Sequence, residues 1–272
     1  MTIEELISTG EMSAIRQREI LLKDDSSLRL LLNPHNVKCT IADNSSARIV
    51  VVYTKPTQSG AEFMVGRGAT LSLVELYLSN VLSQTAIRQE TDSRLKLVEV
   101  VLEGASAATT VELSGEHIES EVDALFMAMG SEHCCIDINM RHLKPQCKSR
   151  SLVKGVATDR ATGEFRGMVY VAQDAQQTDA EQQCKNIELG QSRINAMPQL
   201  EIYADDVRCS HGATVGKSDE EALFYMRQRG LSESAARRLQ VEGFINDIIE
   251  RCDFESIRTL IEAEVSKRLE RL

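Results

Sequence analysis

Short apolar runs separated by polar turns dominate the chain from residue 20 onwards. The runs either alternate apolar with polar residues or are continuously aliphatic, and both patterns predict β-strands. They cover residues 49–53, 71–76, 95–102, 109–113, 122–127, 134–138, 152–157, 168–172, 187–189 and 200–203. A mainly β fold is therefore predicted for the middle of the chain.

Strands of this length and spacing occur in all-β sandwiches, barrels and parallel β-solenoids alike. A sandwich needs many tight hairpin turns, yet the chain has only four prolines and few Asn-Gly or Asp-Gly pairs. We therefore favour a parallel β-solenoid with a C-terminal helical cap. No hexapeptide period is visible, so the repeat must be irregular.

The two ends of the chain carry helical patterns. Residues 2–5 form a Thr-x-x-Glu capping box, and Gly10 follows where a short helix would end. After Gly216, a second capping box at residues 218–221 begins the first of three predicted helices, and the second covers residues 233–251. The apolar positions that predict these three helices are Leu223, Phe224, Ala236, Leu239, Phe244, Ile245, Ile248, Ile249, Ile257, Leu260, Ile261, Val265, Leu269 and Leu272.

These patterns divide the chain into three parts. A short N-terminal helical segment is predicted at residues 1–19, a parallel β-solenoid core at residues 20–216 and a helical region at residues 217–272. We expect the helical region to cover the open end of the β-stack, because exposed strand edges invite aggregation. Its apolar stripe is also suited to receiving a partner.

Composition restricts the core, the partners and the compartment. Hydrophobic residues make up 42% of the chain and aromatic residues 4%, so the core must be aliphatic. The formal charge of −10 argues against binding to nucleic acid phosphates. No apolar stretch approaches the ~18 residues of a membrane-spanning helix, and the N-terminus lacks the basic start of a secretory signal. Seven cysteines without disulfide-scaffold spacing complete the expectation of a cytoplasmic protein with free thiols.

Cys209 and His211 are the strongest candidates for chemistry. Side chains two apart on a strand share a face, about 7 Å apart at the backbone. A thiolate and an imidazole suit iron or zinc, and the neighbouring Arg208 would favour the thiolate form. Two ligands do not complete a metal site, so the others must come from elsewhere in the fold, from a second subunit or from sulfide. On spacing alone, a buried cysteine beside a hydrogen-bonded histidine is the better explanation.

Two enzyme-like interpretations of this stretch fail. Residues 212–218 look like a nucleotide phosphate loop, but the first glycine of such a loop should lie at position 211, which is a histidine. We therefore expect no bound nucleotide. A Cys209 nucleophile with His211 as its base is also disfavoured, because parallel side chains on one strand place the imidazole poorly for taking the thiol proton.

The remaining cysteines are expected to pack in the core. Cys184 alone is typical of a small core residue at the start of a strand. Cys134 and Cys135 are neighbours and must face opposite sides of a strand, which spoils them as a chelating pair. The other thiols and histidines that we expect to be structural are Cys39, His133, His142, Cys147 and Cys252, the last of which packs or faces solvent.

The stretch around this Cys-Ser-His motif resembles the SufB/SufD family of the SUF iron–sulfur cluster assembly system. Residues 198–207 read PQLEIYADDV and residues 209–216 read CSHGATVG, almost residue for residue the SufD motif. FYMRQRG at residues 224–230 continues the likeness into the helical region. Upstream, GEFRG at residues 163–167 and VAQDA at residues 171–175 resemble the preceding strands of the family.

The resemblance implies a right-handed parallel β-helix that dimerises through its last strands. In the family, the Cys and His of this motif lie where two solenoids meet, so Cys209 and His211 become candidate ligands of iron or of a transient iron–sulfur cluster. Cys184 joins them because Gln183-Cys184, with Gly190 six positions after the cysteine, is similar to the SufB segment that supplies a cluster-assembly cysteine. The resemblance also implies that the helical region docks a SufC-type ATPase, with candidate contacts at Phe224, Tyr225, Arg227, Arg229 and Gly230.

The resemblance therefore predicts a non-enzymatic scaffold subunit for cluster assembly that receives its sulfur from a cysteine desulfurase. The alternative is a structural SufD-like subunit that stabilises a SufB-containing complex without ligating the cluster. Gly212 stands where SufB carries a glutamate, whereas Cys184 is SufB-like, and little of the family's sizeable N-terminal helical region precedes the first strands. These departures fit either a homodimer or a compact SufD paired with a SufB-type paralogue.

Overall fold

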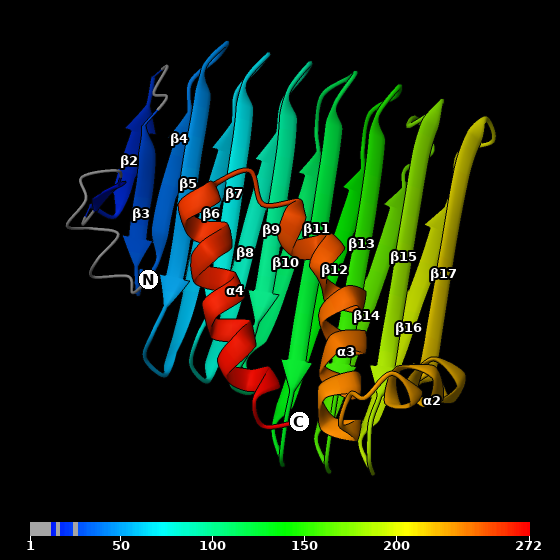
Figure 1. The fold of residues 1–272 in the computed structure, drawn as a ribbon. Coiled ribbons are helices and arrows are strands. Elements are labelled where there is room, and N and C mark those ends of the chain that lie inside the picture. Colours follow the sequence, from blue (N-terminus) through cyan, green and yellow to red (C-terminus); the bar gives the residue numbers. More distant parts are fainter. Residues whose placement is uncertain (1–11, 15–16, 24–26) are drawn as a thin grey trace.

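Two parallel β-sheets wound from one chain make up the body of the protein (Figure 1). The computed structural model describes residues 12–14, 17–23 and 27–272. In this described part, nine strands form sheet A and eight form sheet B, and successive strands alternate between the two sheets. Each strand pairs in parallel with the strand two positions further along the chain. This is the arrangement of a parallel β-helix, so the predicted fold class is confirmed.

The strands lengthen towards the C-terminal end of the β-helix. Sheet A contains β1 (Met12–Ala14), β3 (Leu28–Leu32), β5 (Ser46–Tyr53), β7 (Thr70–Tyr77), β9 (Arg94–Val101), β11 (Glu119–Ala128), β13 (Lys148–Ala157), β15 (Thr178–Glu188) and β17 (Val207–Lys217). Sheet B contains β2 (Glu19–Leu22), β4 (Val37–Ile41), β6 (Thr57–Val65), β8 (Val81–Gln89), β10 (Ser106–Leu113), β12 (His133–His142), β14 (Thr162–Val171) and β16 (Arg193–Ile202). The short helix expected before Gly10 lies outside the described residues.

Single residues in the left-handed backbone region, rather than hairpin turns, mark many corners of the β-helix. Asn44 (φ 55°), Asp92 (φ 60°) and Asp159 (φ 59°) are examples. Asparagine and aspartate tolerate this conformation better than other residues that carry a side chain. Parallel strands need no hairpin, which explains why the chain has few Asn-Gly and Asp-Gly pairs.

The strands of the two sheets differ in how many faces they bury. β8 alternates buried and exposed residues along its whole length, so one face contacts the core between the sheets and the other faces solvent. β7, β9 and β11 instead end in continuously buried stretches. These sheet A strands therefore have a second apolar face, which packs against the C-terminal helices.

The helices α3 (Glu233–Glu250) and α4 (Glu255–Leu269) lie across the outer face of sheet A (Figure 1). The apolar residues that join the two layers are Val50, Val52, Val74, Leu76, Val98, Val100, Ile245, Ile249, Ile257, Leu260 and Ile261. The expectation that the helical region covers the open end of the β-stack is therefore wrong. The physical reason is that sheet A is apolar on both faces, and its second face has to be covered.

The helix starts follow the capping chemistry of the sequence. α2 (Glu220–Gln228) begins after Asp219, whose carboxylate accepts hydrogen bonds from the amides of Glu221 and Ala222. The cap therefore lies one residue later than the predicted Ser218. Ser232 caps α3 in the same way by accepting from the amide of Ala235.

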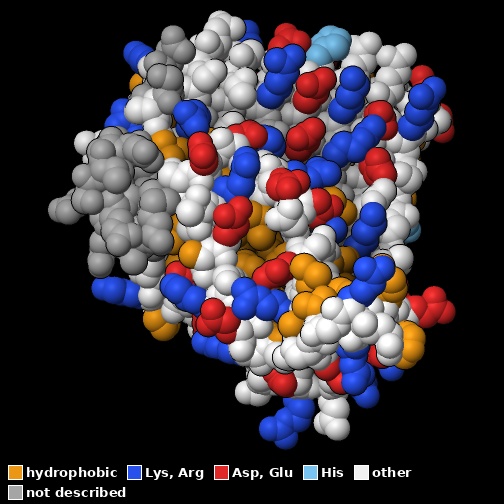
Figure 2. Space-filling view, viewed as in Figure 1, with side chains coloured by type: hydrophobic (Ala, Val, Ile, Leu, Met, Phe, Trp, Pro, Cys, Tyr) orange, Lys and Arg blue, Asp and Glu red, His pale blue; other side chains and the backbone are white. Residues whose placement is uncertain are grey.

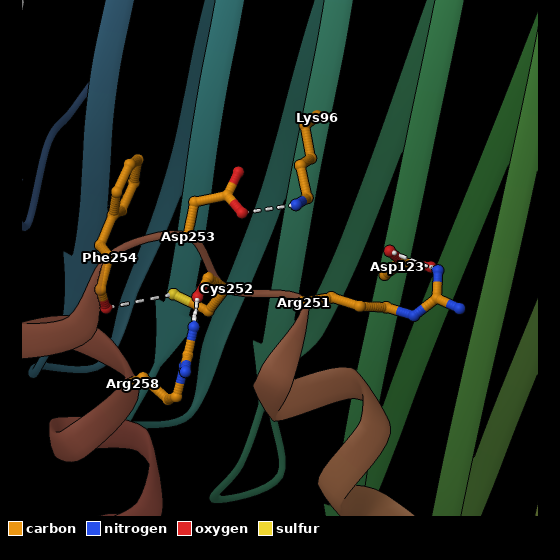
Figure 3. Close-up of polar contacts among 7 residues, drawn as sticks. All are labelled: Lys96, Asp123, Arg251, Cys252, Asp253, Phe254 and Arg258. Atoms are coloured by element: carbon orange, nitrogen blue, oxygen red, sulfur yellow. Dashed lines mark hydrogen bonds and ion pairs between the residues drawn. The ribbon is translucent and has the colours of Figure 1, made fainter.

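Ion pairs fix the loop between α3 and α4 to the β-helix (Figure 3). Lys96 Nζ on β9 lies 2.6 Å from Asp253 Oδ1, and Arg251 Nη1 lies 3.1 Å from Asp123 Oδ1 on β11. Between them, the buried Cys252 accepts at its backbone oxygen from the guanidinium of Arg258. The loop is therefore held at two neighbouring strands of sheet A.

The part of this sheet face that the helices leave uncovered carries both signs of charge side by side (Figure 2). Glu119 pairs with Arg94 at 3.3 Å and with Lys148 at 3.8 Å on the two flanking strands. Arg150 pairs with Asp179 at 2.8 Å. Exposed pairs of this kind contribute little individually, but they prevent a surface of one sign here.

Candidate functional site

The last coil of the β-helix has free strand edges. β17 pairs with β15 on one side, β16 pairs with β14 on one side, and each is the terminal strand of its sheet in the described part of the chain. Figure 1 shows this end on the right. A terminal strand presents unpaired backbone N–H and C=O groups that can pair with another strand.

Cys209 and His211 both lie on β17, on the face that continues the inner surface of sheet A. Their register partners on β15 are Ala180 and Gln182, which are both buried. Cys209 is partly buried and packs against the inner core, while His211 is exposed. The prediction that the two side chains share one face of a strand is thus in agreement with the structure.

The thiol of Cys209 is not activated in this environment. Burial raises its pKa above the usual value, the nearby Asp179 adds to this effect, and a hydrogen bond from the backbone of Ala180 opposes it. The expectation that Arg208 would favour the thiolate is therefore wrong. Arg208 is exposed, and its charge instead helps to lower the pKa of Asp179.

Cys184 lies on the inner face of β15, in register with Ala213 of β17. It is only 1% exposed, and burial raises its pKa to about 12. Asn186 Nδ2 lies 3.1 Å from Cys184 Sγ and donates to the Thr214 carbonyl oxygen at 3.0 Å. Cys184 is therefore a shielded, protonated thiol held against the last strand.

The register of β15 with β17 fixes the distances between the three candidate residues. With a rise of ~3.3 Å per residue and ~4.8 Å between strands, the Cα atoms of Cys184 and His211 are roughly 8 Å apart. The same arithmetic separates Cys184 and Cys209 by roughly 14 Å. His211 is thus the nearest of the pair to Cys184, and the two cysteines of one chain do not meet.

A cavity of about 270 Å³ lies at the candidate site, between residues of β15 and β17. A larger cavity of about 370 Å³ lies elsewhere, between α3 and α4. Cys184 and His211 both line the smaller cavity, together with Gln182. Gln182 is fully buried, and neither atom of its amide has a hydrogen-bond partner. In the described residues, no group of three or more His, Cys, Asp or Glu side chains is arranged to hold a metal ion. Cys209, the third candidate ligand, does not line this cavity.

A second candidate surface lies on α2. Phe224 is 65% exposed and Tyr225 59% exposed, and the guanidinium of Arg229 lies over the Tyr225 ring at 5.1 Å. Arg227 pairs with Glu233 at 3.5 Å, and Gly230 ends the segment with a φ of 94°. We call Phe224 and Tyr225, the two exposed large apolar side chains of α2, the α2 patch. Leu239, which the spacing predicts on the apolar side of its helix, is exposed on α3.

The five remaining cysteines are buried, and of the two histidines expected to pack in the core His142 is buried and His133 is exposed. All seven cysteines are free thiols. Cys39, Cys134 and Cys147 pack in the inner core, and Cys252 is buried beneath the helices. Of the segment 212–218, which the glycine spacing rejects as a phosphate loop, residues 212–217 lie in strand β17.

None of the described helices has the length and apolar character needed to cross a membrane.

Comparisons with known proteins point to one family. The family model described as "SUF system FeS cluster assembly, SufBD core domain" matches residues 23–244. The chain is 36% identical over 162 residues to the iron–sulfur cluster assembly protein SufD of Escherichia coli, covering 59% of this chain and 38% of that protein. It is 29% identical over 256 residues to an iron–sulfur cluster assembly SufBD family protein of Synechocystis, covering 88% and 56%. The protein ABCI7, chloroplastic, of Arabidopsis thaliana is 33% identical over 180 residues, covering 64% and 38%. The chain thus spans 38–56% of the length of these relatives.

Proposed function

The chain belongs to the SufBD family of the SUF iron–sulfur cluster assembly system, and from this premise we propose that it is a scaffold subunit on which nascent clusters form. The proposed site is the interface between its last coil and the last coil of a second β-helix. That second β-helix is another copy of this chain or a SufB-type paralogue. The proposed ligands are Cys184, Cys209 and His211.

The observation that carries this proposal is that Cys209 and His211 lie on the free edge strand β17, with Cys184 on the adjacent strand β15. A symmetric interface repeats each residue of the edge in both partners. Two copies of this coil would bring four thiols and two imidazoles to one place, which is a donor set suited to iron and sulfide. The incomplete ligand set of one chain is then the expected state of half a site.

The shielding of Cys184 implies that the coil must open before the thiol can act. A thiol is a metal ligand and a nucleophile only as thiolate, and burial strongly opposes its ionisation. Movement of β17 away from β15 would expose Cys184 to water and let its pKa fall. α2 follows β17 after only two residues, so a force on α2 acts directly on this strand.

A SufC-type ATPase is the proposed source of that force, with the α2 patch as its docking surface. α3 and α4 are held to sheet A by apolar packing and by ion pairs, whereas α2 has Leu223 as its one buried residue. We further propose that a cysteine desulfurase supplies the sulfur, that the protein acts in the cytoplasm, and that it neither binds nucleotide nor catalyses a reaction itself. Nucleic acid and membranes are not among the proposed partners.

One observation favours the second candidate, a structural SufD-like subunit. Both Cys184 and Cys209 have raised thiol pKa values in the closed coil, which is the environment of an inert cysteine. In that role the edge of β17 would stabilise a SufB-containing complex without ligating the cluster.

Anaerobic reconstitution with ferrous iron and sulfide tests the two roles against each other. We expect visible absorption of a cluster and bound iron in the wild-type chain, with its ATPase and any paralogue present, and loss of both in the double variant Cys184→Ser with Cys209→Ser. The matched control is Cys134→Ser with Cys147→Ser, since these thiols lie in the inner core away from the edge. Equal iron content in the wild type and the edge variant would contradict the scaffold role and leave the structural one.

A further inference from the structure

Two glutamates lie inside the β-helix, far from the proposed cluster site. Glu75 of β7 and Glu99 of β9 are register partners on the inner face of sheet A, and both are fully buried. Neither forms an ion pair with a cation in the described part of the chain. Two adjacent ionised carboxylates without a counter-charge are strongly disfavoured in a water-free interior.

Hydroxyl groups surround the two carboxyl groups. Tyr77 donates to Glu75 Oε2 at 2.9 Å, and Thr85 donates to Glu75 Oε1 at 3.0 Å. Thr109 of β10 donates to Glu99 Oε1. The only other titratable group facing the pair from the described strands is Tyr53, whose ring stacks on Tyr77 at a centroid distance of 5.0 Å. All of these groups are neutral at physiological pH.

One oxygen of the cluster has no donor. Glu99 Oε2 is buried and has no hydrogen-bond partner among the hydroxyl groups, while its neighbour Glu75 already accepts from two of them. A proton on Glu99 Oε2 would turn this oxygen into a donor to the carboxylate of Glu75, its register partner on the adjacent strand. The same proton would remove one of the two buried charges.

We propose that Glu75 and Glu99 are a proton-sharing acid pair, in which Glu99 carries one proton on Oε2 and donates it to Glu75, and that loss of this proton at alkaline pH loosens the β-helix around β7 and β9. The pair binds one proton in the folded state that the unfolded chain releases.

The direction of the pH dependence follows from linkage. Burial and, next, the charge of Glu75 raise the pKa of Glu99 from 4.5 to about 8. A carboxyl group whose pKa is higher in the folded state makes folding less favourable as pH rises from its unfolded value to its folded value. The stability that this proton contributes is therefore fully present below about pH 4.5, falls as the pH rises from there to about 8, and is gone above about 8.

Infrared spectroscopy of the wild-type chain tests the proton directly. Asp123 has a pKa raised to about 6, chiefly by burial, so the titration starts above about pH 7.5, where its carboxyl group is ionised. We expect a protonated-carboxyl carbonyl band at this pH that disappears on raising the pH to about 10 and is absent from Glu99→Gln at both. A wild-type spectrum without this band overturns the proposal, and this measurement does not depend on whether any variant folds.

Thermal unfolding supplies the second measurement. The amide introduced by Glu99→Gln would keep an acceptor for Thr109 and offer an N–H donor to Glu75 without a titrating proton. We expect the melting temperature of the wild type to fall between about pH 5 and pH 8 and that of Glu99→Gln to fall less, so that the variant is the more stable protein above about pH 8. Glu116→Gln, at an exposed turn position, is the matched control and should follow the wild type. Parallel curves for the wild type and Glu99→Gln would refute the link between the proton and stability.

Discussion

Arg268 of α4 forms ion pairs and a hydrogen bond with residues of the β-helix. Replacing it by alanine should therefore destabilise the protein. Arg268 is 2% exposed. Its guanidinium lies 2.6 Å from Glu103 Oε1, contacts Glu132 Oε2, and donates to the Met127 carbonyl oxygen at 3.1 Å. The variant removes the guanidinium from all three acceptors, although Glu132 Oε2 still accepts from the amide of Met129.

The magnitude follows from how exposed the partners are. Breaking a buried ion pair by removing one partner costs about 3–5 kcal/mol. The side chains of Glu103 and Glu132 are 44% and 22% exposed, so water compensates part of their loss. We therefore expect a loss of about 2–3 kcal/mol in the free energy of unfolding, or a fall of roughly 5 °C in melting temperature for a chain of this size.

Urea unfolding followed by circular dichroism measures this loss, and the adjacent residue provides the control. Lys267 pairs with Glu264 at 2.6 Å, but its side chain is 64% exposed, so Lys267→Ala should cost no more than about 0.5 kcal/mol. Arg268→Lys should lie between the two, because it keeps the charge but loses the fork that reaches several acceptors. If Arg268→Ala and Lys267→Ala unfold at the same urea concentration, the anchoring role of the guanidinium is refuted.

Two further predictions concern the proposed site and its partner. Under native conditions iodoacetamide should label Cys209 well before Cys184, because Cys184 is buried and its thiol has a pKa of about 12. Mass spectrometry of the labelled peptides measures the two rates. Equal labelling rates would show that the coil is open at rest. Replacing Phe224 and Tyr225 together by serine should weaken binding to a SufC-type ATPase at least about tenfold without lowering the melting temperature. The control Leu82→Ser, at an exposed apolar position on sheet B, should leave the affinity unchanged. Unaltered affinity in the α2 variant would mean that the ATPase docks elsewhere.

The strands were predictable from the sequence. The position of the helices was not predicted, although the apolar pattern of alternate strands indicates it. Strands β7 and β9 contain aliphatic runs that only Glu75 and Glu99 interrupt and that are buried at consecutive positions, whereas in β8 buried and exposed residues alternate. A continuous run in every second strand means that one sheet is apolar on both faces. That pattern places a covering layer on sheet A, but it becomes visible only once alternate strands are assigned to different sheets.

The candidate site was predictable in parts. Residues two apart on a strand share a face, and this was enough to place Cys209 and His211 together. The contact between Cys184 and the last strand depends instead on the register of Cys184 with Ala213, and an irregular repeat gives no fixed spacing from which to obtain it. Glu75 and Glu99 were missed for another reason, since a glutamate within an apolar run is normally assigned to the solvent side.

The coil that carries the candidate ligands is also the one best able to open. Along β13, nearly every residue is buried or half-buried, whereas in β17 all residues after Cys209 are exposed. β17 is bonded on one edge only, so its separation from β15 breaks one ladder and exposes little apolar surface. Local opening has a low free-energy cost where buried contacts are few. Cys184 lies on the adjacent strand β15. Its thiol can therefore be shielded at rest and exposed when β17 separates, while the rest of the β-helix stays folded.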